Sequence, residues 1–224
     1  MSINDYHKKL TDEKLEGNEH RNFVGSYWDE IGSLQFNFMK DFGLKPSMQF
    51  LDVGCGCMRG GRFFVSWLDE GNYFGIDMNE SLIKAGYDRE LSQELKDKLP
   101  VKNLLIDDLF RVNKFNVKFS MALAISVFTH LPLAYLRLCL IELARATEEG
   151  AVLFATFFIC PEDRSEDDSL MHEQGGVITF PFSDPYHFKF SKLSNSIKGL
   201  PWDIELVGDW KHPRGQLMVR FVRK

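Results

Sequence analysis

Long apolar runs, cysteine pairs and a surplus of basic residues are scarce in this sequence, and each shortage excludes a class of protein. No 18 consecutive apolar residues occur, and residues 1–5 have neither a basic region nor an apolar core, so we expect no membrane span and no signal peptide. The four cysteines, at 55, 57, 139 and 160, offer no second pair at metal-ligand spacing. The net charge of −5 gives no basic footprint for nucleic acid. We therefore expect a cytoplasmic protein with no metal, no nucleic-acid partner and no membrane partner.

Apolar residues, in contrast, are plentiful enough for a core. They make up 44% of the 224 residues, which suits one sizeable domain. The apolar run from Met48 to Val53 predicts a short buried strand, and the glycines between 54 and 61 allow a tight turn close to a ligand. An apolar face at Phe63, Phe64, Trp67 and Leu68 predicts a helix after the turn. Strand, glycine turn and helix form the opening unit of a nucleotide-binding α/β domain.

The glycine turn lacks the ending that phosphate-binding loops require. A P-loop ends in Gly-Lys-Ser/Thr, where this chain has Arg59-Gly60-Gly61-Arg62, and the dinucleotide pattern G-x-G-x-x-G would need glycine at position 59. With the spacing G-x-G-x-x-x-G, and with Asp52 two residues ahead of Gly54, the turn resembles motif I of the class I methyltransferases that use S-adenosylmethionine (SAM).

A carboxylate ends the second expected strand, residues 72–77. Asp77 lies about 20 residues past the glycine turn, where an acidic side chain accepts hydrogen bonds from both ribose hydroxyls of an adenosine ligand. The alternative is a helix N-cap, but Asn79 can fill that role and leave Asp77 for a ligand. Met78 can lie on one face of the adenine or fill the core. A single helix is expected over 81–95.

The third expected strand, 101–106, ends in two adjacent carboxylates, Asp107 and Asp108. In the family that the chain resembles, a carboxylate here accepts a hydrogen bond from the exocyclic amine of adenine. The family's Asp-aliphatic pattern favours Asp108 with Leu109 over Asp107. A solvated turn is the alternative for both.

A second point of resemblance follows the fourth expected strand, 119–125. The stretch Ser126-Val127-Phe128-Thr129-His130-Leu131 is similar to one that many small-molecule methyltransferases carry there. His130 is a candidate general base for an incoming hydroxyl or amine. The alternative is a structural histidine that hydrogen-bonds to the backbone at a helix start. Pro132 should begin the next helix, and Glu148-Glu149-Gly150 should turn into a strand at 151–158.

The last third of the sequence contains an acidic insertion. Residues 160–174 carry six carboxylates against one arginine, which describes either a solvated loop or part of a substrate lid spanning 159–200. An acidic lid favours a cationic or hydroxyl-rich acceptor. The aromatic stretch 180–188 is a candidate wall of the acceptor pocket, with Phe182 as a substrate contact and Tyr186 and His187 as secondary base candidates; the alternative is a satellite core. Strands at 203–209 and 216–223 predict a terminal antiparallel hairpin.

The first 45 residues are expected to form a helical arm or cap that precedes the main domain, 46–224. Apolar residues every three or four positions from Phe23 to Phe42 predict an amphipathic helix or two short ones. The resemblance implies that such a helix covers the cofactor, so that Tyr27 or Trp28 could close the site. Both could equally be core anchors.

These signals together predict an α/β fold: a Rossmann-like, seven-stranded, mostly parallel sheet with a C-terminal antiparallel hairpin, helices on both faces and an N-terminal helical cap. The resemblance implies SAM as cofactor and in-line transfer of its methyl group to an oxygen or nitrogen of a small molecule such as a sugar or secondary metabolite. The expected cofactor contacts are Asp52, Gly54, Cys55, Gly56, Asp77, Met78, Asp108, Leu109 and Ala124. The alternatives are a protein or nucleic-acid methyltransferase and a noncatalytic adenosine-cofactor-binding protein. The acceptor and the oligomeric state are left open.

Overall fold

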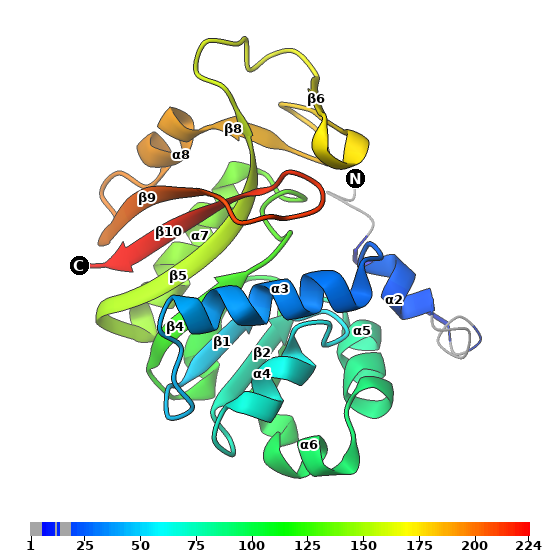
Figure 1. Ribbon diagram of the computed structural model, residues 1–224. Coiled ribbons are helices and arrows are strands. Elements are labelled where there is room, and N and C mark those ends of the chain that lie inside the picture. Colours follow the sequence, from blue (N-terminus) through cyan, green and yellow to red (C-terminus); the bar gives the residue numbers. More distant parts are fainter. Residues whose placement is uncertain (1–5, 12, 14–18) are drawn as a thin grey trace. The chain divides into compact units, whose positions relative to one another are not determined.

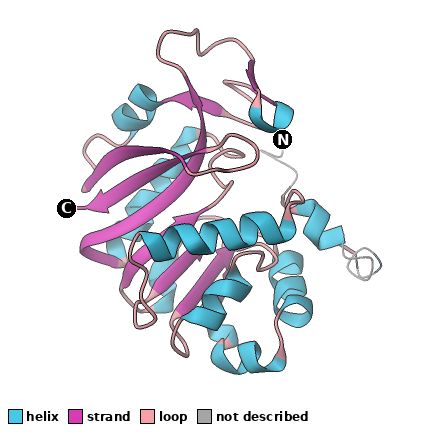
Figure 2. Cartoon of the chain, viewed as in Figure 1, coloured by secondary structure: helices cyan, strands magenta, loops and turns pink. Residues whose placement is uncertain are grey.

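The structure is a computed structural model that describes residues 6–11, 13 and 19–224 (Figure 1). Half of residues 1–22, which belong to the helical arm or cap expected over 1–45, lie outside the described residues. The described chain divides into two compact units, and the boundary falls between Asp108 and Leu109. We call them the N-terminal unit and the C-terminal unit. Both combine helices with strands (Figure 2).

The N-terminal unit alternates helices and strands. Its elements in chain order are α2 (Glu19–Phe23), α3 (Trp28–Asp41), β1 (Phe50–Val53), α4 (Gly61–Trp67), β2 (Tyr73–Asp77), α5 (Glu80–Ala85), the π-helical turn η1 (Gly86–Glu90), α6 (Gln93–Lys98), the 3-10 turn η2 (Val101–Asn103) and β3 (Leu104–Ile106). The strands lie in the order β3-β2-β1, and both pairs are parallel. Parallel neighbours need crossover connections, which α4 supplies between β1 and β2, and α5 and α6 between β2 and β3.

Aromatic side chains hold α3 and α4 together and join α4 to the sheet. The Phe36 ring stacks on Phe63 with the ring centroids 6.0 Å apart, and the Phe64 ring lies 4.4 Å from Phe50 of β1. A Cβ at Gly32 would lie 2.6 Å from the carbonyl oxygen of Arg59, so only glycine lets α3 approach the glycine turn this closely. The amphipathic helix expected between residues 23 and 42 is confirmed as α3, with α2 before it.

The single helix expected over 81–95 is wrong. The helical segment continues as the π-helical turn η1 from Gly86 and ends at Glu90, and Leu91 is extended. Ser92 then caps the separate helix α6 by accepting a hydrogen bond from Leu95 N. The last residue of η1, Glu90, has a nearly buried carboxylate that lies 2.6 Å from His20 Nε2 and accepts two hydrogen bonds from Arg21. Contacts with residues 70 positions away therefore accompany the break.

The C-terminal unit carries the remaining strands. Its elements are η3 (Val112–Phe115), β4 (Phe119–Ala124), α7 (Leu133–Arg145), β5 (Thr147–Cys160), β6 (Leu170–His172), η4 (Gln174–Gly176), β7 (Val177–Thr179), β8 (His187–Lys189), α8 (Phe190–Ser196), β9 (Trp202–Asp209) and β10 (Leu217–Arg223). The strands β4, β5, β10 and β9 follow one another in the sheet. β4 and β8 pair with β5 in parallel, whereas β10 pairs antiparallel with β5 and β9. The predicted terminal hairpin is confirmed.

Phenylalanines form the core of this unit. The rings of Phe128 and Phe157 stack with centroids 5.7 Å apart, and Phe221 of β10 lies 6.4 Å from Phe157. All three are almost completely buried. Phe128 belongs to the Ser-Val-Phe-x-His-Leu stretch, so this core fixes the backbone that carries His130.

The turn expected at Glu148-Glu149-Gly150 is part of β5 instead. Thr147 already pairs with Phe119, and the next paired residues are Met121 and Val152, so the register shifts and the intervening residues of β5 bulge outward. Gly150 has φ +83, a conformation that suits glycine. No helix within the described parts of the chain is long and apolar enough to span a bilayer.

Candidate active site

Backbone amides hold the carboxylate of Asp77 at the end of β2. Gly56 N donates to Asp77 Oδ2 at 2.9 Å, and Asn79 N donates to Oδ1 at 2.8 Å. The Asn79 side chain in turn accepts hydrogen bonds from Ser81 N and Leu82 N, so Asn79 caps α5 as predicted. Burial raises the pKa of Asp77, and the amide hydrogen bonds oppose that shift. Asp77 thus connects the glycine turn to the start of α5.

The glycine turn follows β1, and its first residues hydrogen-bond to the backbone of β2. The amides of Gly54 and Cys55 both donate to Ile76 O, at 2.7 and 3.1 Å. Gly54 and Gly56 have φ angles of +72 and +50, which glycine adopts without strain. The Cys55 side chain is buried, and its sulfur would lie 2.9 Å from a Cβ at Gly75. Packing against Gly75 is therefore the observed role of Cys55, and its cofactor contact stays a prediction.

Asp52 of β1 is buried and has an aromatic partner. Tyr73 donates its hydroxyl proton to Asp52 Oδ2 at 2.8 Å. Burial raises the pKa of Asp52 to about 7, and the Tyr73 hydrogen bond works against that rise. Burial also raises the pKa of Tyr73 well above its ordinary value. The sequence indicated Asp52 but gave no sign of the contact with Tyr73.

Exposed apolar side chains gather at the ends of β2 and β3. Met78 follows β2, and Ile106, the last residue of β3, pairs with Asp77; both side chains are exposed. Among the two adjacent carboxylates, Asp107 is buried and donates its amide to Asp77 O, whereas Asp108 is exposed. Of the other expected cofactor contacts, Leu109 is exposed and Ala124, the last residue of β4, is buried.

The candidates Tyr27 and Trp28 lie in different environments. Trp28 is buried with Cys57 and Leu82 in a small cluster, and the Arg21 guanidinium lies 5.0 Å from the centre of its ring. Its position matches the core-anchor alternative. Tyr27 is exposed and has φ +50 just before α3. Tyr27 is therefore the one of the two whose ring reaches solvent.

In the C-terminal unit, His130 meets a carboxylate. His130 Nδ1 lies 2.5 Å from Oδ1 of Asp184, and the two side chains are only 22% and 25% exposed. The structural alternative was a hydrogen bond to backbone; the Nδ1 partner is a side chain 54 residues away. A histidine oriented by a carboxylate is a common arrangement for moving a proton.

The secondary candidates differ in their access to solvent. His187 is fully buried, and both ring nitrogens have partners: Nδ1 lies 2.8 Å from Thr179 Oγ1, and Nε2 lies 3.0 Å from Glu166 O. This environment argues against His187 as a base. Tyr186 is buried too, and burial together with the charge of Asp184 raises its pKa. Phe182 is 77% exposed, as a substrate contact would be before an acceptor binds.

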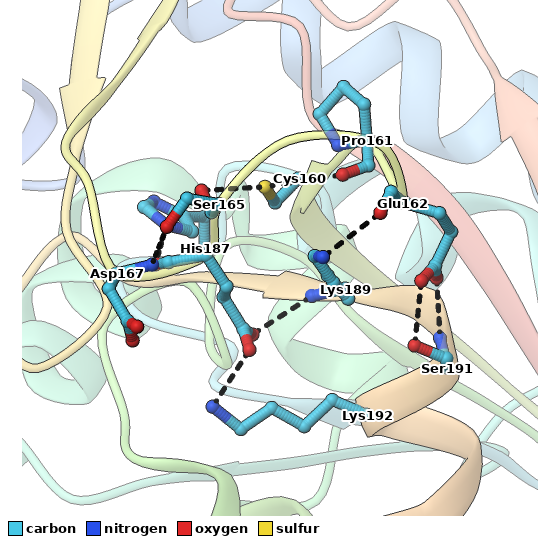
Figure 3. Close-up of polar contacts among 10 residues, drawn as sticks. Cys160, Pro161, Glu162, Ser165, Asp167, His187, Lys189, Ser191 and Lys192 are labelled. Atoms are coloured by element: carbon cyan, nitrogen blue, oxygen red, sulfur yellow. Dashed lines mark hydrogen bonds and ion pairs between the residues drawn. The ribbon is translucent and has the colours of Figure 1, made fainter.

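Internal contacts use two carboxylates of the acidic insertion. Glu162 accepts hydrogen bonds from the amide and the hydroxyl of Ser191, which places a carboxylate at the start of α8 (Figure 3). Glu166 accepts from Lys189 N at 3.0 Å and pairs with Lys192 at 3.1 Å. Asp163, Asp167, Asp168 and Glu173 are exposed. Part of the expected lid is therefore anchored to β8 and α8.

The described residues contain no group of three or more His, Cys, Asp and Glu side chains placed to hold a metal ion. Sequence reasoning did not single out Asp184, Ile106 or Tyr73, which the structure places beside His130, Asp77 and Asp52. Asp184 lies within the aromatic stretch 180–188, and no sequence motif indicates a role for it. Ile106 is the last apolar residue of the expected strand 101–106. The position of Ile106 at the end of the strand was the available signal, because ligands bind at the carboxyl ends of parallel strands.

No protein-family model matches the chain. Magnesium protoporphyrin IX methyltransferase of Synechocystis PCC 6803, with bound SAM, is 14% identical with a TM-score of 0.62, over 96% of this chain and 99% of that chain. SAM-bound CalS10, an amino pentose methyltransferase of Micromonospora echinaspora, is 14% identical with a TM-score of 0.62, over 97% and 100%. The glycopeptide N-methyltransferase MtfA, in complex with S-adenosylhomocysteine, is 13% identical with a TM-score of 0.62, over 93% and 98%. These similarities confirm the predicted fold class.

Proposed function

We propose that the chain is a SAM-dependent methyltransferase that methylates an oxygen or nitrogen atom of a small molecule. One observation carries the proposal: both carboxylate oxygens of Asp77 are fixed at the end of β2 by amides of the glycine turn and of the start of α5. A carboxylate in this place suits the two ribose hydroxyls of an adenosine ligand. The fold is shared with solved methyltransferases that hold SAM or S-adenosylhomocysteine, which supports this choice of ligand.

The residues of the N-terminal unit fit such a ligand chemically. Each oxygen of Asp77 accepts an amide hydrogen bond, and a carboxylate oxygen can accept more than one. The exposed side chains of Met78 and Ile106 offer apolar contact to an adenine ring. We propose Asp108 as the acceptor for the exocyclic amine, and Asp52 and Gly54 as neighbours of the methionine portion.

When bound, SAM supplies a methyl group on a positively charged sulfur, so the donor is already activated. The protein mainly has to hold the acceptor in line and exclude water from the reacting atoms. A hydroxyl or ammonium acceptor must also lose a proton. We propose His130 for that step, because its imidazole is partly exposed and has a carboxylate partner.

The exposed carboxylates of the insertion indicate which charge the acceptor carries. Asp163, Asp167, Asp168 and Glu173 leave this surface anionic even though Glu162 and Glu166 have internal partners. Such a surface attracts cationic acceptors and repels acidic ones. The acceptors named for the similar structures are a porphyrin, an amino pentose and a glycopeptide, so the fold is compatible with chemically different small molecules. A protein or nucleic-acid acceptor is the alternative.

Two further predictions from the sequence belong to this proposal. We propose that the helical segment before β1 caps the cofactor, with Tyr27 as its solvent-facing ring. We also propose that the protein acts in the cytoplasm and needs no metal.

Calorimetric titration of the purified protein with SAM and, separately, with NADH tests the choice of cofactor. We expect micromolar binding of SAM and none of NADH. Asp77→Asn should weaken SAM binding, while Asp41→Asn, an exposed carboxylate at the end of α3, should not. A screen of paired amine and carboxylate acceptors then tests the reaction. SAM binding without transfer to any acceptor would favour a noncatalytic adenosine-binding protein.

A further inference from the structure

The contact between His130 and Asp184 joins two segments that the sequence keeps apart. His130 lies between β4 and α7, whereas Asp184 lies between β5 and α8. From here on, the insertion means all residues between β5 and α8, 161–189, which include the acidic residues described above. Their side chains approach to 2.5 Å and are each about three-quarters shielded from solvent. An exposed surface pair would contribute little, but shielding from water strengthens the attraction.

Backbone hydrogen bonds hold Asp184 beside His130. Tyr186 N donates to Thr129 O at 2.7 Å, which ties the Asp184 segment to the residue before His130. Within the same segment, Phe180 N donates to Pro185 O at 2.8 Å, and His187 N donates to Phe180 O at 3.2 Å. The backbone on both sides of Asp184 is therefore fixed.

A buried chain of side chains supports this segment from the insertion. Thr179 Oγ1 lies 2.8 Å from His187 Nδ1 and 3.0 Å from His172 Nε2. Because Glu166 O can only accept, His187 Nε2 carries a proton. The Thr179 hydroxyl also lies within hydrogen-bond distance of Leu170 O, at 3.3 Å. Figure 3 shows His187 beside the contacts that tie the acidic segment to Lys189, Ser191 and Lys192.

We propose that the folded insertion holds Asp184 against His130, and that Asp184 is a positioning residue for proton transfer. A carboxylate at Nδ1 keeps the ring proton on that nitrogen, so Nε2 of the neutral ring is the atom with the lone pair. Nε2 then takes the proton of the acceptor's hydroxyl or ammonium group, which frees a lone pair on the acceptor atom for the new bond to the methyl carbon. The carbon–sulfur bond would break in the same step, and S-adenosylhomocysteine would leave with the bonding electrons. This role rests on the proposed function; the tautomer does not.

Nuclear magnetic resonance of the histidine ring nitrogens tests the tautomer without any acceptor. His130→Gln identifies the His130 signals by their loss, and the pH is raised until the ring is neutral. We expect the proton on Nδ1 in the unmodified protein and in Asp184→Asn, whose amide oxygen still accepts. In Asp184→Leu the proton should move to Nε2. Asp168→Asn, an exposed carboxylate of the same insertion, is the control and should change nothing.

Two results would overturn the positioning role. One is a proton on Nε2 in the unmodified protein; the other is a ring that keeps Nδ1–H in Asp184→Leu. Thr179→Val tests separately whether the buried side chains of the insertion support Asp184. The change keeps the shape of the side chain and removes its hydrogen bonds to His172 and His187. We expect a mixture of tautomers at His130 in this variant. A folded Thr179→Val protein with unmixed Nδ1–H would show that the buried chain does not support Asp184.

Activity on an acceptor found in the screen tests the link to catalysis. Asp184→Leu should lower kcat about tenfold or more while the Kd for SAM stays unchanged. Combining it with His130→Gln should be no worse than His130→Gln alone, because both changes disable one proton transfer. An unchanged kcat in Asp184→Leu would refute the catalytic link. Absence of transfer by the unmodified protein would instead refute the proposed function and leave the tautomer result intact.

Discussion

The strand ends of the N-terminal unit and the insertion of the C-terminal unit hold their polar side chains by different means. Asp77 is held by amides of neighbouring turns, and every part of that arrangement follows from the glycine turn and a helix cap. Asp184 meets His130, which lies 54 positions earlier, within a segment that both backbone and side-chain hydrogen bonds hold in place. The position of the Asp77 carboxylate therefore follows from two short motifs, whereas the His130–Asp184 pair depends on how the whole segment between β5 and α8 folds.

The largest effect that we expect concerns the C-terminal side of this comparison. His130→Gln should lower turnover about 100-fold or more, because it removes the group that takes the acceptor's proton. Calorimetry should find the Kd for SAM unchanged, since no proposed cofactor contact is altered. A decrease in turnover of less than tenfold would mean that His130 has a structural role and that the insertion does not contribute to catalysis through Asp184.

On the N-terminal side, Asp52 makes stability depend on pH. Its pKa is raised to about 7 in the folded protein, so the unfolded chain releases this proton at lower pH than the folded chain does. Its contribution to stability is full below pH 4 and is lost as the pH rises to 7. Between pH 5 and 8, the unmodified protein should lose about 2 to 3 kcal/mol of unfolding free energy relative to Asp52→Asn.

Urea unfolding at several pH values measures this difference. The asparagine keeps an oxygen that can accept from Tyr73, so the comparison isolates the charge. Asp41→Asn, at an exposed site, should follow the unmodified protein at every pH. Parallel curves for Asp52→Asn and the unmodified protein would mean that the Asp52 carboxylate is ionised as easily as an exposed one.

The affinity for SAM tests the proposed roles of the carboxylates at the ends of β2 and β3. Asp77→Ala should weaken SAM binding by about 1 to 3 kcal/mol, because the ribose hydroxyls lose their acceptor. Asp108→Asn and Asp107→Asn form a matched pair at the end of β3, and we expect the larger loss at Asp108. A larger loss at Asp107 would reverse our assignment of the adenine contact. Unchanged affinity in Asp77→Ala would remove the observation on which the proposed function depends.

The sequence could predict what short-range rules control. The strands, the glycine turn, the position of Asp77 and the Asn79 cap all depend on residues within a few positions of one another or on one parallel pairing. It could not predict the break after Glu90, because the partners of that carboxylate lie 70 positions earlier. It also missed Asp184, since no local pattern records which of the many carboxylates in the insertion meets a histidine.

The smallest effect separates local capping from long-range attachment at one residue. Asn79 Oδ1 caps α5, while Nδ2 donates to Tyr6 O and Lys8 O at 2.8 and 2.9 Å. Asn79→Ala should lower the unfolding free energy by about 1 kcal/mol, and Ser92→Ala, at the longer and more exposed cap of α6, by less. Asn79→Asp keeps the capping oxygen but loses both Nδ2 hydrogen bonds. If Asn79→Asp is as unstable as Asn79→Ala, the attachment of residues 6–8 contributes more than the cap, and even this locally predicted residue acts mainly at long range.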